Sequence, residues 1–233
     1  MPPPLLMIVA TACVALNPLP TNCWIGFHGE YQLVATDGSD PGAAAVEEAA
    51  LIIHARVSRI GFADFEVRTR SDGVIDIDLP PTADQIDVRE LIRVRGEFAV
   101  VPLPEGVSVD EGDPIPADLA PLFGREALQQ VRPGGDQHGG SALDIELTPG
   151  AAGTFADYTG RSVGQQFAIV IDGVVFTAPV IQARIDGGEA QIVGIDVDVA
   201  NRLATILSLP PLPGTLNELS FSAVDPPPAC PRT

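Results

Sequence analysis

The feature that most constrains this chain is a proline-rich segment between two stretches of regularly spaced apolar residues. Five prolines fall between Pro102 and Pro121, together with several acidic residues. Because proline lacks a backbone donor and interrupts regular helices and central strands, this segment is predicted to be a linker or a long loop. A chain of 233 residues can bury one large core or two small ones. We therefore expect two successive compact modules.

The stretch before the prolines begins with a short strand at residues 31–36 and a helix after it. Asp40 can cap this helix, and Pro41 suits its first position. Apolar residues then recur at intervals of three and four, which predicts an amphipathic helix ending at Gly61. The predicted buried stripe is Val46, Ala49, Ala50, Ile53, Val57 and Ile60, and the residues kept off it are Glu47, Glu48, Arg56 and Arg59.

A hairpin and a second helix follow. Ser71–Gly73 has the composition of a hairpin turn, and the strand after it alternates apolar residues with Asp76 and Asp78, which are expected to face solvent. The further elements of this module are predicted at residues 65–69, 75–79, 84–93 and 97–101. The order strand, helix, strand, strand, helix, strand predicts a ferredoxin-like α+β fold.

The stretch after the prolines predicts a second α+β module with antiparallel strands. Asp172-Gly173 and Gly187-Gly188 supply turns between apolar runs. Helices are predicted near residues 122–131, 150–159 and 196–207, and strands at 142–147, 167–171, 174–178, within 185–193 and at 219–223. The Gly-rich residues 133–140 lack the spacing of a phosphate-binding loop and are predicted to be a flexible loop.

Charge limits the partners of this chain. It has 13 basic and 31 acidic residues, a net charge of −18. A charge of this sign repels the phosphates of nucleic acids and anionic lipids, so nucleic acid is excluded as a partner. With 45% apolar residues, the chain is expected to fold rather than form a disordered acidic tail.

The amino-terminal residues resemble an export signal. Leu5–Leu16 has the length of a signal-peptide core, and no apolar run approaches the roughly 20 residues of a membrane span. Residues Ala10–Ala12 precede Cys13 as in a lipoprotein processing box, so Cys13 is a lipidation candidate. Cys23 and Cys230 either form a disulfide, as an exported protein allows, or remain two unpaired thiols.

The motifs that resemble catalytic or metal sites are interpreted as structural features. Gly160–Gly164 matches the G-x-S-x-G pattern around Ser162, but here a helix precedes and a strand follows, the reverse of a nucleophile elbow. All three histidines precede Ser162 and share no metal-ligand spacing with one another or with the cysteines. His54 is predicted at the edge of the core. We predict no catalytic residue, metal or cofactor.

Several motifs resemble the first periplasmic domain of the protein-export subunit SecD. The longest similarity is to the head subdomain of that domain, and an earlier stretch is similar to its base. The matching residues are Phe155, Thr159–Gly164, Phe167–Val175, Ala178–Ile181, Ile185–Ile192 and Ala200–Leu207 for the head, and Ile53–Gly61 and Ile77–Pro80 for the base. The resemblance covers about Ala43 to Phe221 and implies a leader at 1–22, a base at 23–103, a linker at 104–120, a head at 121–214 and a final strand and tail at 215–233.

The resemblance implies a non-catalytic module that binds polypeptide outside the cytoplasm as an accessory to export, without the family's transmembrane segments. Its partners would be unfolded or exported polypeptide and a membrane-embedded Sec component, with contact to the membrane only through a lipid anchor. The alternative is an envelope structural or interaction lipoprotein that kept this fold without an export role. The candidate polypeptide-binding residues are Phe155, Phe167, Phe176, Val180 and Ile181.

Overall fold

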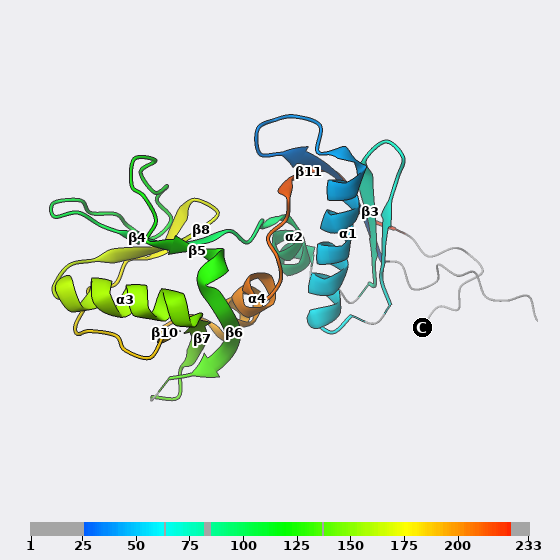
Figure 1. The fold of residues 1–233 in the computed structure, drawn as a ribbon. Helices are drawn as coiled ribbons and strands as arrows, with labels where there is room; N and C mark the ends of the chain where they lie inside the picture. Colours follow the sequence, from blue (N-terminus) through cyan, green and yellow to red (C-terminus); the bar gives the residue numbers. More distant parts are fainter. Residues whose placement is uncertain (1–25, 63, 82–84, 137, 225–233) are drawn as a thin grey trace, which may run out of the picture.

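The computed structural model describes residues 26–62, 64–81, 85–136 and 138–224, and shows two modules side by side (Figure 1). Its elements are β1 (Phe27–Ala35), α1 (Gly42–Arg59), β2 (Glu66–Thr69), β3 (Val74–Leu79), α2 (Gln85–Arg93), β4 (Phe98–Pro102), β5 (Phe123–Gly124), the 3₁₀ turn η1 (Arg125–Ala127), β6 (Leu128–Gly135), β7 (Ser141–Leu147), α3 (Pro149–Arg161), β8 (Phe167–Ile171), β9 (Val174–Thr177), β10 (Glu189–Val193), α4 (Val197–Leu207) and β11 (Gly214–Ala223). The predicted α+β fold with antiparallel sheets is confirmed.

The base module is one antiparallel sheet, in the order β11-β1-β3-β2, with α1 and α2 on one face. The predicted stripe of α1 is buried against this sheet, except that Ile60 is partly exposed. Ile75, Ile77 and Leu79 of β3 face the helices, as their alternation predicts. The helices thus cover this face of the sheet with apolar contacts.

The strand that completes the base sheet is not the predicted one. Residues 97–101 were the expected fourth strand, but β4 pairs with β5 and β8 of the other module, and β11 pairs with β1 instead. The reason is that β4 is apolar on both faces: Phe98 and Val100 join one core cluster, and Val101 joins another. Such a strand needs cover on both faces, which the base sheet does not provide.

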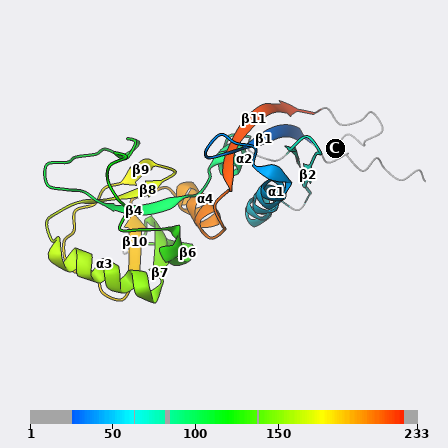
Figure 2. The same ribbon diagram turned by 45° about the horizontal axis from the view of Figure 1, so that its top comes forward.

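The head module contains two sheets, β5-β4-β8-β9 and β10-β7-β6, together with α3 and α4 (Figure 2). Phe123, Phe155 and Phe167 meet in its core with edge-to-face rings. The helix predicted near residues 122–131 is wrong. This segment forms β5, η1 and the start of β6, because Val131 pairs with Ile145 of β7 and the sheet pairing overrides local preference.

The proline-rich segment is irregular, as predicted, but it covers a sheet. It leaves β4 and returns to β5, two paired strands of the head. Between them, Val107, Val109, Ile115 and Leu119 pack over the cluster that includes Val101, Val170 and Val175. Residues 103–122 therefore supply the second apolar face that β4 and β8 require.

Arg56 is fully buried, so the prediction that it lies off the stripe of α1 is wrong. Its guanidinium donates hydrogen bonds to the backbone carbonyls of Leu91, Val94 and Arg95, with distances of 3.0 Å to Leu91 and 2.8 Å to Arg95. These carbonyls lie at the end of α2 and just beyond it. A cation is favourable there, because the last carbonyls of a helix lack partners and carry partial negative charge.

The chain crosses between the modules twice, and head residues hold both crossings. Asp172, at a positive φ of 51° in the β8–β9 turn, accepts hydrogen bonds from the backbone N–H groups of Arg95, Gly96 and Glu97. Arg125 donates to the carbonyls of Gly96, Leu207 and Leu209. Charged side chains of the head therefore hold the backbone of both crossings by hydrogen bonds.

Candidate functional site

An apolar cavity of about 510 Å³ opens in the head between its two sheets. Its floor is formed by core residues of β4, β7, β8 and α3, and its rim by residues 177–185 and β10. The apolar residues that line it are Phe98, Val100, Phe123, Ile145, Leu147, Phe155, Phe167, Ile169, Pro179, Val180, Ile181, Ile185, Ile192 and Val193. A volume in this range suits a small ligand or a few side chains of a peptide.

Four of the five predicted binding residues line this cavity. Phe155, Phe167 and Ile181 are buried and form part of the head core, whereas Val180 is 43% exposed at the rim. Phe176 lies apart from them, half-buried in a separate groove beside α4 and β11. Val180 is therefore the member of the set that a ligand can reach without disturbing the core.

Sequence reasoning predicted the strand β10 but not its place at the rim of the cavity. This strand pairs only with β7 in the described part of the chain, so its other edge has no strand beside it. Val193, at its end, is 54% exposed. The available signal was the Gly187-Gly188 turn within residues 185–193, which predicts a strand after it but not the place of that strand at the edge of a sheet.

Ser162 lies directly after α3 and is followed by a turn. It is buried at the end of α3, where its N–H bonds the carbonyl of Thr159. Among the described residues, no histidine or carboxylate is hydrogen-bonded to it. His54 is exposed on α1 and its ring lies 4.7 Å from that of Phe65.

The Gly-rich segment is not a loop throughout, because residues 133–135 belong to β6 and pair with β7, and the turn to β7 follows them. Asp136 accepts hydrogen bonds from the N–H groups of His138 and Gly140, so its own carboxylate occupies the backbone donors of the turn. A phosphate-binding loop needs such donors free for its ligand.

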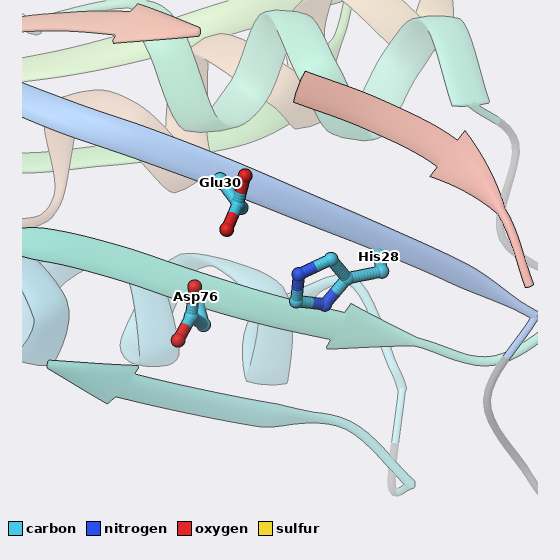
Figure 3. A group of neighbouring side chains, drawn as sticks. All are labelled: His28, Glu30 and Asp76. Carbon is cyan, nitrogen blue, oxygen red and sulfur yellow. The ribbon is translucent and has the colours of Figure 1, made fainter. Parts of the chain in front are cut away.

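A charged cluster lies on the face of the base sheet opposite the helices. His28 and Glu30 on β1 lie beside Asp76 on β3 (Figure 3), and one ligand atom of each lies within 4.8 Å of the others. The Asp78 carboxylate lies 2.7 Å from Nδ1 of His28 and 2.5 Å from the guanidinium of Arg68. Its side chain is only 3% exposed. The prediction that Asp76 and Asp78 face solvent is wrong, because side chains of β1 and β2 cover them.

Arginine already supplies the positive charge of this cluster. Arg70 donates to Glu30 at 2.7 Å and to Asp76 at 3.3 Å. A cation that used Glu30 and Asp76 as ligands would have to displace this guanidinium. The contacts of the described residues therefore indicate an ion-pair network that holds β1, β2 and β3 together.

This network predicts a dependence of stability on pH. Hydrogen bonds from Arg70 lower the pKa of Glu30 and of Asp72 below their ordinary values of 4.5 and 3.8. The folded state then binds fewer protons than the unfolded state, so the stabilisation is present above these values and is lost as pH falls through the lowered pKa values. We expect the melting temperature of Arg70→Gln to lie below that of the parent at neutral pH and to converge with it only as pH falls well below the ordinary pKa values of 4.5 and 3.8. A difference that stays constant across thermal melts in this range would contradict the assignment.

Three predicted features fall outside the described residues, namely the leader with Cys13 and the possible partners Cys23 and Cys230. Within the described residues, no helix combines the length and the apolar character that crossing a membrane requires.

Comparison with known proteins shows similarity to SecD and SecDF. Residues 102–214 match the family model described as SecDF, P1 head subdomain. The chain is 29% identical to protein translocase subunit SecD of Acidaminococcus fermentans over 228 residues, which cover 95% of the chain and 51% of that protein. It therefore spans about half the length of this relative.

Solved structures of SecDF are similar to this chain. A crystal structure of SecDF in a super-membrane-facing form matches with a TM-score of 0.74 and 25% identity, covering 87% of this chain and 30% of that one. A structure of SecDF, described as a membrane component that enhances protein export, matches with a TM-score of 0.68 and 26% identity, covering 84% of this chain and all of that one (100%). The chain thus belongs with SecD and SecDF, as a base-plus-head unit of their first periplasmic domain that carries the P1 head subdomain at residues 102–214.

Proposed function

We propose that this chain binds unfolded polypeptide outside the cytoplasm, at the apolar cavity of its head, as a non-catalytic accessory to protein export. The observation that carries the proposal is the position of the cavity beside the unpaired edge of β10. Kinship with SecD and SecDF supports the role in export and a membrane-embedded Sec component as partner.

The chemistry of this cavity suits an extended chain. A strand added to the edge of β10 would gain backbone hydrogen bonds that do not depend on sequence. Alternate side chains of that strand would point toward the apolar lining, where Val180 and Val193 are accessible. Such a site prefers unfolded chains, because a folded protein has already paired its backbone and buried its apolar side chains.

The direct test compares one secretory protein in two states. Reduced and carboxymethylated substrate should bind the chain in fluorescence anisotropy, and the same protein in its native state should bind at least tenfold more weakly, which corresponds to about 1.4 kcal/mol. Equal affinity for the two states would contradict polypeptide binding of this kind and would favour a structural role in the envelope.

Charge at the rim should weaken binding without unfolding the head. We expect Val180→Asp with Val193→Asp to weaken binding of the unfolded substrate at least tenfold, about 1.4 kcal/mol, because a carboxylate beside the apolar lining loses solvation when the ligand covers it. The matched control is Val197→Asp, since Val197 is 56% exposed and lies on α4 outside the cavity. Equal loss of affinity in the control, or full affinity in the double variant, would place the binding surface elsewhere.

A further inference from the structure

The edge of β10 forms one wall of the head cavity. All five residues of the strand, Glu189–Val193, line that cavity. On its other side β10 pairs with β7 (Figure 2), and no strand of the described residues occupies the edge beside the cavity. This wall is therefore a row of backbone N–H and C=O groups among apolar side chains. Such groups need a hydrogen-bonding partner once a ligand displaces water from them.

The hydrogen-bond pattern identifies the free backbone groups of this edge. Directly before β10, the N–H of Leu147 donates to the carbonyl of Gly188 at 2.8 Å. In an antiparallel pair, residues that bond across the ladder alternate with residues whose N–H and C=O point the other way. Counted from Gly188 in the register of β10 with β7, the free N–H and C=O groups are those of Glu189, Gln191 and Val193.

The two faces of β10 differ in chemistry. Ile192 is buried in the head core and lies opposite Leu143 of β7. Glu189 and Gln191 lie on the other face, because successive side chains of a strand alternate, and the Gln191 amide donates to Asp144 at 2.7 Å. A strand added beside β10 would share these two faces. Alternate side chains would enter the cavity, and the others would extend the outer polar face.

The outer face carries unbalanced negative charge at Glu189. This residue is exposed and lies directly opposite Glu146 of β7, where like charges repel. Asp144 has the Arg132 guanidinium at 3.6 Å, whereas Glu146 accepts a hydrogen bond only from the neutral amide of Gln129. In the described part of the chain, no ion pair involves Glu189 or Glu146. A cation placed beside Glu189 would offset this repulsion.

We propose that the head selects an extended segment in which apolar and polar residues alternate, with a lysine or arginine opposite Glu189. The inference rests on the polypeptide binding proposed above and names the class of segment that this site takes. The apolar residues would enter the cavity beside Ile192, and the basic residue would pair with Glu189 at the Cβ separation of about 4.5–5.5 Å that cross-strand neighbours have. The net charge of −18 attracts any basic chain, but the register at β10 ties part of the preference to one carboxylate.

The test uses fluorescein-labelled nonapeptides in which leucine alternates with lysine, glutamine or glutamate. In fluorescence anisotropy, the full chain should bind the lysine peptide about tenfold more tightly than the glutamate peptide, with the glutamine peptide between them. A fourth peptide has the composition of the lysine peptide but with its leucines grouped at one end. It should bind about fivefold more weakly than the alternating peptide, because a strand beside β10 would then direct charged side chains into the apolar cavity.

Glu189→Gln tests the proposed pair. It keeps the size of the side chain but removes its charge, and it should reduce the preference for lysine over glutamate by about threefold. Glu189→Lys should reduce this preference further. The matched control is Glu48→Gln, because Glu48 is exposed on α1 of the base and its substitution changes the net charge by the same amount. The control should keep the preference of the parent chain.

Failure of this inference is distinguishable from failure of the proposed function. An equal preference in Glu189→Gln and Glu48→Gln would overturn the pairing with Glu189 while polypeptide binding stands. Equal binding of the alternating and grouped lysine peptides would overturn the strand register. If neither the glutamine peptide nor an unfolded secretory protein binds, the proposed function itself fails and the inference fails with it.

Discussion

Replacement of Arg56 by methionine is expected to lower the free energy of unfolding by about 3 kcal/mol. Methionine has a similar length but donates no hydrogen bond, so the carbonyls of Leu91, Val94 and Arg95 would lose their donor. Each buried carbonyl left without a partner costs about 1–3 kcal/mol. Burial lowers the pKa of Arg56 to about 10, so the guanidinium stays charged at neutral pH and these bonds are charge-assisted.

Urea denaturation followed by circular dichroism measures this loss. Arg161→Met is the matched control, because Arg161 is also an arginine in the last turn of a helix but is exposed. It should change the free energy of unfolding by no more than about 0.5 kcal/mol. Arg56→Lys should recover only part of the stability, since an ammonium group lacks the planar fork that reaches several carbonyls together. Equal losses for the two methionine variants would show that the bonds at the end of α2 contribute little.

Replacement of Phe155 by alanine is expected to destabilise the head by about 3–5 kcal/mol. Its ring is buried and lies edge-to-face with Phe123 at 5.7 Å and with Phe167 at 5.5 Å, measured between ring centroids. The substitution removes both ring contacts and leaves a void in the floor of the head cavity. Binding of polypeptide would fall only as a consequence of the disrupted cavity.

The comparison with the rim variants separates packing from recognition. Phe155→Ala should shift the urea midpoint strongly, whereas Val180→Asp with Val193→Asp should weaken binding with little change in the midpoint. Phe155→Leu, which keeps most of the apolar volume, should recover more than half of the lost stability. A Phe155→Ala protein that is as stable as its parent but fails to bind would show that the ring contacts the ligand rather than supporting the floor.

Local patterns identified most elements of this chain. The alternation of Ile75, Ile77 and Leu79 predicts which face of β3 packs against apolar side chains, and the stripe of α1 predicts the packed face of that helix. These patterns work because a side chain's face follows directly from the period of its own element. The motifs at residues 167–192 likewise indicate the family.

The same patterns were insufficient for the charged residues. The period places Asp76 and Asp78 opposite the isoleucines, which is correct, but their burial depends on His28 and Arg68 from neighbouring strands. Arg56 occupies a helical position whose surroundings are set by α2, 35 residues further along at Leu91. No local signal reports partners at such separations.

The sequence by itself determined the two α+β modules, their family and the apolar residues of both cores, since these follow from periodicity and motif. The tertiary structure decided which strand closes the base sheet, where the proline-rich segment packs, and which carbonyls the buried Arg56 binds. β4 and β11 are both credible strands by local pattern. The choice between them depends on whether both faces of a strand find apolar cover, and that cover comes from distant parts of the chain.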